Sequence, residues 1–435
     1  SINEVVAVGY GTKLKREVTG SQVSLKGKEI TDMPAQSFES GIQGKAAGVQ
    51  VITGSGVAGS GALIRIRGVA SLSAGGDPLY VVDGIPITQD YFLLGNGGGF
   101  NNNPLASINP NDIEDIQILK DAAATSIYGS RGANGVVLIT TKRAKKKGLN
   151  FDFTVRLGTA TPTVLPQMLN NKEWLQMYQE AWENDGHTGK AVLPNNVTWE
   201  QAEQNNTDWI KETMGRGFKQ MYSLGTGYKG KKIGIYATFS LDDNGSYVIG
   251  NKYNRKSGRI NIDYDPIKNL HISFSSSLSK GTNTRVDAAW SGGFGAAMST
   301  ALPIFPVYES PGNFLNLGPN PVRIRELKDW KTIENRSINN INVSYIVSPR
   351  LSLTASSSLD LMNFKEDKFE DKRLLGVSSL NGQTNLFEKV SVNYNYNVVF
   401  NYQVFKSVLH DVKMMVGTEY QRFGNSSDNY FATNV

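Results

Sequence analysis

Apolar and polar residues alternate through the last two thirds of the chain, and this period of two constrains the fold more than any other feature. Each alternating segment is near the length of a tilted, membrane-crossing β-strand, about 9 to 11 residues. The segments are 151–157, 218–228, 233–241, 260–264, 270–278, 341–345, 351–361, 392–402 and 414–420. The pattern therefore predicts an antiparallel sheet of about nine strands with one apolar face.

The connections between these segments alternate in length. Tight turns are expected at 228–231, 264–270, 347–350 and 405–408, and long loops at 159–217, 243–256, 281–336 and 364–387. Short turns on one rim and long loops on the other are typical of outer-membrane barrels. Aromatic residues at strand ends suit the interfacial girdles of such a barrel: Tyr228, Phe239, Tyr264, Phe274, Tyr345, Phe400 and Tyr402. A soluble β-sandwich shares the alternation, but the connections favour the membrane barrel.

The odd number of strands adds a further expectation. A bacterial single-chain barrel has an even number of strands and closes on itself. We therefore expect the remaining strands of the barrel to lie beyond Val435.

Composition excludes several other classes of protein. The 435 residues include no cysteine, which removes disulfides, thiolate nucleophiles and cysteine metal sites. The net charge of +6 is spread along the chain rather than gathered in one basic domain, so no nucleic-acid partner is expected. No apolar run approaches the roughly 18 residues of a transmembrane helix.

No catalytic, cofactor-binding or metal-binding residues are predicted. The three histidines, His187, His271 and His410, are far apart in sequence and belong to no metal-spaced motif. The run Asp242–Gly245 resembles the start of a calcium loop but lacks the glutamate that the twelfth position needs. A turn is the better interpretation.

The run Gly54-Ser55-Gly56-Val57-Ala58-Gly59 matches the spacing of a dinucleotide-binding loop, and Asp77 follows eighteen residues later. Such a loop must open a helix whose N-terminus receives the pyrophosphate. Residues 62–68 alternate as a strand instead. The motif therefore predicts a glycine hairpin, and an NAD-dependent enzyme is the disfavoured alternative.

Residues 1–148 have a different pattern and end in a basic linker at 142–147. Helices are expected at 37–45 and at 120–128, the second ending at Gly129. Strands are expected at 48–52, 63–68, 79–83, 113–119 and 135–141. A folded domain ahead of a large barrel suggests a plugged lumen. The predicted organisation is a flexible N-terminal segment at 1–12, an α+β plug at 13–148, and the first part of an antiparallel transmembrane β-barrel at 149–435.

Four blocks of the first region resemble the plug of SusC/RagA-type TonB-dependent outer-membrane transporters. They are Leu63–Gly68, Pro78–Pro86, Ile108–Glu114 and Ala124–Gly135, and they keep their order and spacing. The resemblance implies an outer-membrane location, contact with outer-membrane lipid, and a plug inside a barrel of 22 strands. It also implies a SusD-like lipoprotein as a lid, energy from TonB with ExbB and ExbD, and import of oligosaccharides or, alternatively, oligopeptides.

The resemblance identifies a candidate TonB box in the run Glu4, Val5, Val6, Ala7, Val8, Gly9 and Tyr10. TonB could add a strand to such an extended segment. The plug motif residues are Arg65, Arg67, Tyr80, Asp83, Tyr128 and Arg131. Arg65 and Arg67 are expected on one strand face, paired with carboxylates or with the barrel wall, or else simply solvated. Asp83 is interpreted as a turn residue.

Substrate contacts are expected in an amide-rich and aromatic stretch, because amides bond hydroxyl and peptide groups and aromatic rings stack on sugars. The candidates are Tyr91, Phe92, Asn96, Asn101, Asn102 and Asn103, together with Trp290 in the long loop 281–336. Segment 171–184 is expected to be a loop helix that packs on its neighbours. A siderophore or cobalamin importer, which shares the plug and barrel, and a soluble adhesive β-protein remain as alternatives.

Overall fold

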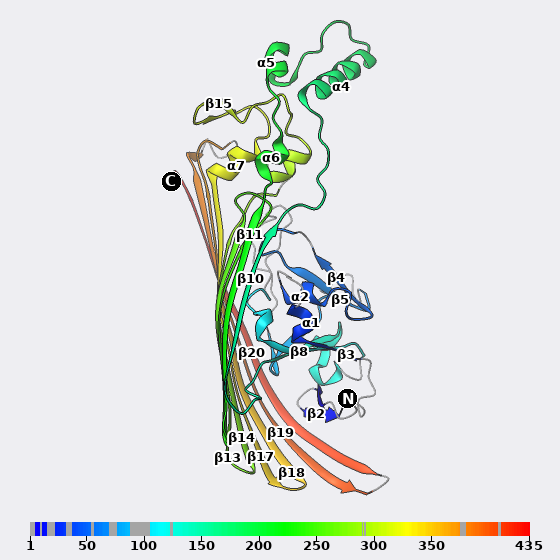
Figure 1. Ribbon diagram of the computed structural model, residues 1–435, viewed down its shortest axis with the longest axis vertical. Coiled ribbons are helices and arrows are strands. Elements are labelled where there is room, and N and C mark those ends of the chain that lie inside the picture. Colours follow the sequence, from blue (N-terminus) through cyan, green and yellow to red (C-terminus); the bar gives the residue numbers. More distant parts are fainter. Residues whose placement is uncertain are drawn as a thin grey trace.

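The computed structural model describes residues 5–8, 11–14, 22–31, 37–53, 56–68, 76–87, 105–121, 125–288, 290, 293–374, 380–407 and 410–435. A tall, curved β-sheet forms a wall, and a smaller domain lies against its concave side (Figure 1). Helical loops project beyond one end of the wall, and tight turns join the strands at the other end (Figure 1).

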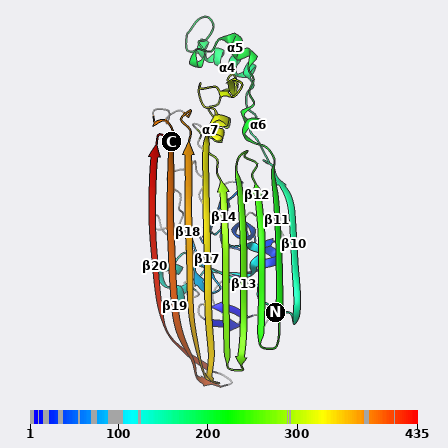
Figure 2. The ribbon, with the colours of Figure 1, turned by 90° about the vertical axis from the view of Figure 1, so that its left-hand side faces the viewer.

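The wall is a single antiparallel sheet in which every strand pairs with its neighbours in chain order (Figure 2). Its strands are β10 (Gly148–Ala160), β11 (Gly217–Lys229), β12 (Ile233–Gly245), β13 (Lys252–Ile267), β14 (Leu270–Thr284), β17 (Lys328–Ser348), β18 (Leu351–Glu370), β19 (Gln383–Lys406) and β20 (Asp411–Thr433). The prediction of nine strands is confirmed. Several strands extend well past the predicted segments, because toward the loop end polar residues occupy both faces and the alternation fades.

The two faces of the wall differ in chemistry. Strand register places Ile262, Phe274 and Ile341 side by side on the outer face. On the outer face of β10, Phe151 and Phe153 are 68% and 70% exposed. An apolar face of this extent is stabilised by lipid rather than by water. Among the described residues, no helix has the length and apolar character needed to cross a membrane.

The connections follow the predicted alternation, with three corrections. Tight turns occupy 230–232, 268–269 and 349–350, as expected, and β20 begins at Asp411, shortly after β19 ends at Lys406. The expected long loop at 243–256 is wrong: only 246–251 separate β12 from β13, because both strands continue their pairing above the apolar band. The loops expected at 281–336 and 364–387 are shorter, at 285–327 and 371–382, for the same reason.

The smaller domain is built on a five-stranded sheet of order β3-β8-β9-β6-β7. Its strands are β3 (Gln22–Lys26), β6 (Leu79–Val82), β7 (Ile85–Pro86), β8 (Ile113–Leu119) and β9 (Val136–Thr141). Helices α1 (Gly27–Thr31) and α2 (Phe38–Ile42) pack on this sheet and share its core, in which Ile30, Ile42, Ile64, Ile116 and Ile139 are fully buried. Three of the five predicted strands are β6, β8 and β9 of this sheet, the other two form a separate hairpin, and β3 and β7 were not predicted.

The glycine motif does form a hairpin. Strand β4 (Val49–Thr53) pairs antiparallel with β5 (Ala62–Ile66), so the residues after the motif form a strand and no helix follows Gly59. Gly54 and Ser55 lie outside the described residues. Of the helix expected at 120–128, Lys120 and Asp121 are not helical and 122–124 lie outside the described residues; a 3₁₀ helix follows at Ser126–Gly132, interrupted at Gly129 with φ 60°.

The loops at one end of the wall pack together. Helices α4 (Asn171–Asn184), α5 (Trp199–Gln204) and α6 (Trp209–Thr213) lie in the loop after β10, and α7 (Pro321–Leu327) lies before β17. Leu175, Trp209, Ile304 and Phe305 share one buried cluster, so the two loops form a common cap. The predicted loop helix is confirmed as α4, which begins with a capping box of Asn170 and Glu173.

Candidate functional site

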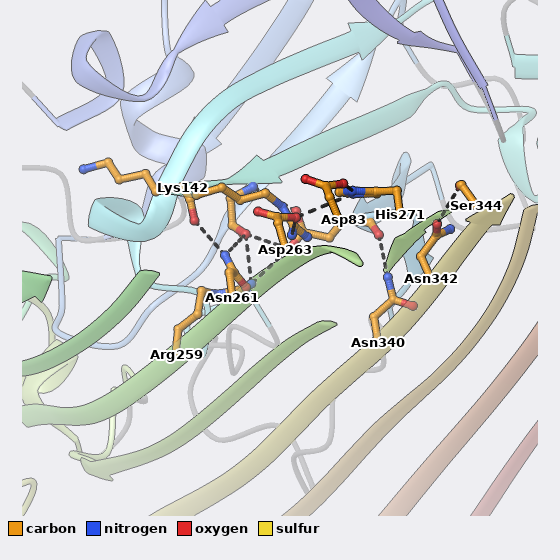
Figure 3. A network of polar contacts seen from close by, with 12 residues as sticks. Asp83, Lys142, Arg259, Asn261, Asp263, His271, Asn340, Asn342 and Ser344 are labelled. Carbon is orange, nitrogen blue, oxygen red and sulfur yellow. Dashed lines mark hydrogen bonds and ion pairs between the residues drawn. The ribbon is translucent and has the colours of Figure 1, made fainter. Parts of the chain in front are cut away.

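Asp83 lies at the tight turn between β6 and β7 and points toward the wall (Figure 3). Asp83 and Gly84 have φ of 48° and 89°, as the two central residues of a type I′ hairpin turn require. The Asp83 carboxylate accepts hydrogen bonds from the Thr141 amide at 2.9 Å and the Thr141 hydroxyl at 2.7 Å. Asp83 is a turn residue, as predicted, and its carboxylate is also fixed against the wall.

Side chains from the wall complete this cluster. Arg259 on β13 donates to the Asp83 carboxylate at 2.9 Å and to the Thr141 hydroxyl at 3.0 Å. Asn261, two residues along the same strand, donates to the Thr141 hydroxyl at 3.0 Å, and Asn340 on β17 donates to the Asp83 carbonyl at 3.1 Å. We call Asp83, Thr141, Arg259, Asn261 and Asn340 the latch (Figure 3).

The latch is shielded from water. The side chains of Arg259 and Asp83 are only 5% and 6% exposed. A buried ion pair is strongly destabilised when one partner is removed, because the remaining charge has no compensation. Asp263 follows Asn261 on the face of β13 that lies against the smaller domain. It pairs with Arg143 at 2.6 Å and adds a further contact between that domain and the wall.

A second group of contacts lies around the 3₁₀ turn Pro110–Asp112. Asn109 donates to Ser240 at 2.8 Å, and Thr238 donates to the Asp112 carboxylate at 2.8 Å. Burial raises the pKa of Asp112, although Arg259, the hydrogen bond from Thr238 and Arg255 all oppose the rise. Arg259 thus acts on two carboxylates of the smaller domain.

The seam between the smaller domain and the wall is mainly polar. The domain has its own apolar core, to which the wall contributes Ile338. Most of the other described contacts across the seam are hydrogen bonds, such as Arg255 to the Ala106 carbonyl at 2.7 Å and Asn393 to the Pro86 carbonyl at 2.9 Å. Water can replace hydrogen bonds of this kind, so these contacts can be broken and re-formed.

Two of the predicted plug motif residues pair inside the smaller domain rather than with the wall. Arg65 bonds Asp77, and Arg67 bonds Asp121. The expectation that both arginines share one strand face is wrong, because β5 ends at Ile66 and Arg67 follows it with φ 58°. The change of backbone direction at Arg67 removes it from the face that Arg65 occupies.

The other three plug motif residues have separate roles. Tyr80 is buried in the core, where its ring meets Phe38 edge to face at 6.1 Å. Tyr128 packs on the second core cluster of the domain, and burial raises the pKa of its hydroxyl, with Glu419 adding to the rise. Arg131 reaches across to Gln421 on β20.

The candidate TonB box is described only in part. Val5–Val8 form strand β1, which pairs with β2 (Gly11–Leu14); Glu4, Gly9 and Tyr10 lie outside the described residues. The expected substrate residues Tyr91, Phe92, Asn96, Asn101, Asn102 and Asn103 also lie outside them. Trp290 is 64% exposed in the loop before β17.

A charged cluster ties the loop end of the wall together. Trp330 on β17 donates to Glu366 on β18 at 2.8 Å, and the Arg285 guanidinium lies 5.0 Å from its ring. Lys328 bridges Asp287 at 2.7 Å and Glu370 at 2.8 Å. Burial lowers the pKa of Arg285 to about 10, and Glu366 opposes the fall. This cluster fixes the start of the loop 285–327 against β18.

Sequence reasoning did not identify the wall residues of the latch. Arg259, Asn261 and Asp263 occupy the polar positions of a strand whose other positions, Ile260 and Ile262, are apolar. Charged residues on the inner face of a membrane strand are a signal for contact with something in the lumen. The partners could not be read from that signal, since they lie more than a hundred residues away.

Residues 14–136 match the family model "TonB-dependent Receptor Plug Domain". The chain is 29% identical over 445 residues to TonB-dependent receptor P26 of Formosa agariphila, a match that covers 97% of the chain and 42% of that protein. It is also 29% identical over 458 residues to TonB-dependent receptor SusC of Bacteroides thetaiotaomicron, covering 97% and 43%.

Among solved structures, the RagAB peptide importer in its open-open state has the same fold. Its TM-score is 0.79 at 20% identity, with 99% of this chain and 50% of that chain covered. The chain thus spans about half the length of that structure and 42–43% of the two curated relatives named above. The relatives are named as receptors or importers, which agrees with the prediction that the chain is not an enzyme.

The smaller domain is thus a plug, and the wall is part of an outer-membrane β-barrel with its apolar face toward lipid. Together with the plug and the antiparallel wall, these matches support the identification of the chain as part of a SusC/RagA-type TonB-dependent outer-membrane transporter.

Proposed function

We propose that the chain provides the plug and the first part of the barrel of a TonB-dependent importer of oligosaccharides, working with a SusD-like lipoprotein at its extracellular mouth. The polar seam carries this proposal. Among the described residues, the plug core takes one side chain, Ile338, from the wall, and the seam also holds hydrogen bonds and the ion pairs Arg259–Asp83 and Arg143–Asp263, so the plug would leave the lumen and return with most of its core intact. A permanently fixed domain would be expected to share more of its apolar core with the wall than the single residue Ile338.

Energy from TonB would reach the plug through its N-terminal segment. Strand β1 pairs on one edge with β2, and no other described strand pairs with it. A free strand edge accepts an added strand through main-chain hydrogen bonds. Force along this segment would act on the plug and ultimately on the latch.

The experiment replaces Val6 and Val8 by proline, which removes two backbone donors from the candidate TonB box. A matched variant with threonine at both positions keeps the backbone donors and the β-branched shape. We expect the proline variant to bind cargo normally but to lose uptake, and the threonine variant to retain both. Uptake by the proline variant at the unaltered rate would contradict the proposed role of the segment.

The cargo would meet the loop cap first. Trp290 is exposed there, and Tyr308 stacks on Phe314 with ring centroids 4.9 Å apart. Aromatic faces of this kind bind sugar rings, and the expected amide-rich stretch at 88–103 would supply hydrogen bonds. The same loops would face the lipoprotein lid.

An oligopeptide cargo is the second candidate. The likeness to a structure named as a peptide importer and the charged cluster around Trp330 favour it, since charged side chains can bind peptide termini. Growth of a deletion strain on single polysaccharides and on defined peptides separates the two. Loss of growth on a glycan alone supports oligosaccharide import, and loss on peptides alone assigns the second candidate.

A further inference from the structure

Two lysines stand directly opposite each other on the outer face of the wall. Strand register pairs Lys256 of β13 with Lys280 of β14, and both side chains are exposed. Like charges in directly opposed positions destabilise a sheet unless something neutralises them. Among the described residues, neither lysine has a carboxylate within ion-pair distance.

Their neighbours on the same face are different. Lys252 pairs with Asp243 at 2.9 Å, Lys331 with Asp329 at 2.9 Å, and Lys365 with Glu388 at 3.3 Å. The chain therefore supplies carboxylates to the other lysines of this region and leaves this adjacent pair for an anion from outside.

The surface beside the pair has the shape for a lipid. The register continues the row from Lys280 to Asn335 on β17 and Asn363 on β18, both exposed amides. A shallow hollow of about 530 Å³ includes this row, since Lys256, Lys280, Asn335 and Asn363 line it together with Ser257, Ser279, Arg336 and Ser337. The other lining residues, Phe239, Gly258, Leu278 and Leu361, form the apolar part of the hollow, on the side toward the tight turns.

The height on the wall fits a headgroup. Below this row, the outer face of β13 continues through Gly258, Ile260 and Ile262 to Tyr264, and that of β14 through Leu278 and Phe274 to Leu270. Eight residues of tilted strand span roughly 20 Å along the membrane normal, close to the apolar band of about 25 Å in outer-membrane barrels. The lysine pair thus lies where the band ends, on the side of the long loops, which face the outside of the cell.

We propose that Lys256, Lys280, Asn335 and Asn363 bind the phosphate of a phosphorylated glycolipid of the outer leaflet, with an acyl chain in the hollow beside Leu278. The phosphate supplies the negative charge that the lysine pair lacks, and the amides donate to its remaining oxygens. The acyl chain covers the exposed apolar side chains below it.

The test uses the transporter purified from the outer membrane in mild detergent and probed with monophosphoryl lipid A by native mass spectrometry. We expect K256Q/K280Q to bind the lipid about 30-fold more weakly than wild type, since each lysine near an anionic lipid contributes about one factor of five. K252Q/K331Q, which alters two paired lysines on the same face, should bind normally. K256R/K280R keeps both positive charges and should retain binding. Retained binding would show that K256Q/K280Q binds weakly because it has lost those charges.

Two further arms identify the source of the phosphate. Inorganic phosphate at millimolar concentration should not displace the lipid, because it cannot occupy the apolar part of the hollow. Dephosphorylated lipid A should bind as weakly to wild type as intact lipid binds to K256Q/K280Q. Equal lipid binding by K256Q/K280Q and K252Q/K331Q, or full displacement by inorganic phosphate, would overturn the proposal.

Discussion

The latch can be tested by replacing Arg259 with methionine, which keeps much of the side-chain length and removes the charge. The Asp83 carboxylate would then keep its two bonds from Thr141 and lose its bond from the wall. Because both side chains are almost fully buried, the uncompensated carboxylate should cost about 3–5 kcal/mol. That corresponds to a roughly 10²- to 10⁴-fold increase in the equilibrium constant for separation of the plug from the wall at the latch.

The amide of Thr141 reports this change directly, since it donates to the Asp83 carboxylate at 2.9 Å. Hydrogen exchange measured by mass spectrometry on peptides covering 136–142 should show protection reduced by roughly 10²-fold or more in Arg259→Met, where opening of the seam is the exchange route. Lys252→Met, on the outer face of the same strand, should exchange as wild type does, because its ion pair with Asp243 is exposed and contributes little.

A double variant separates the charge from the shape. Asp83→Asn combined with Arg259→Met removes both charges, and we expect it to recover much of the lost protection. Equal exchange in Arg259→Met and Lys252→Met would refute the reasoning, since it would mean that the ion pair does not hold the plug.

Three other predictions follow from single contacts. Burial raises the pKa of Asp112 above its ordinary 3.8, so the stability that the protonated carboxyl contributes is fully present below pH 3.8 and is lost as the pH rises through the raised pKa. The Tm of Asp112→Asn relative to wild type should therefore increase between pH 4 and pH 8. A constant difference in Tm would contradict this. In Gly27→Ala, the added Cβ would lie 1.9 Å from the Ile113 carbonyl oxygen, which should destabilise the plug by about 3 kcal/mol in thermal unfolding, whereas Gly158→Ala, with open space around it, should be neutral. Trp209→Phe removes the bond from its indole to the Leu302 carbonyl at 2.9 Å and should cost about 1–3 kcal/mol, seen as faster proteolysis within 161–216; the exposed Trp290→Phe is the control, and equal cleavage of the two would count against a shared loop cap.

The sequence was most informative where one face of a strand decides the pattern. Alternation at 233–241 and 270–278 located β12 and β14, because lipid on one side and a polar lumen on the other impose a period of two. It failed at 243–256 and 281–336, where the strands rise beyond the apolar band and both faces become polar. There the strands are held by backbone hydrogen bonds to their neighbours. Such bonds do not depend on the type of side chain, so they cannot be recognised in the sequence.

The plug shows the same division. The pair Asp83-Gly84 specified its hairpin turn locally, since few residues adopt two successive positive φ values. The sequence by itself thus determined the strands of the wall, the turn that carries Asp83, and most strands of the plug. Only the tertiary structure decided that Asp83 meets Arg259 across 176 residues of chain, and that Lys256 and Lys280 stand together without a carboxylate. Register and domain placement bring these residues together, and both arise from the summed packing of many strands rather than from any local run of residues.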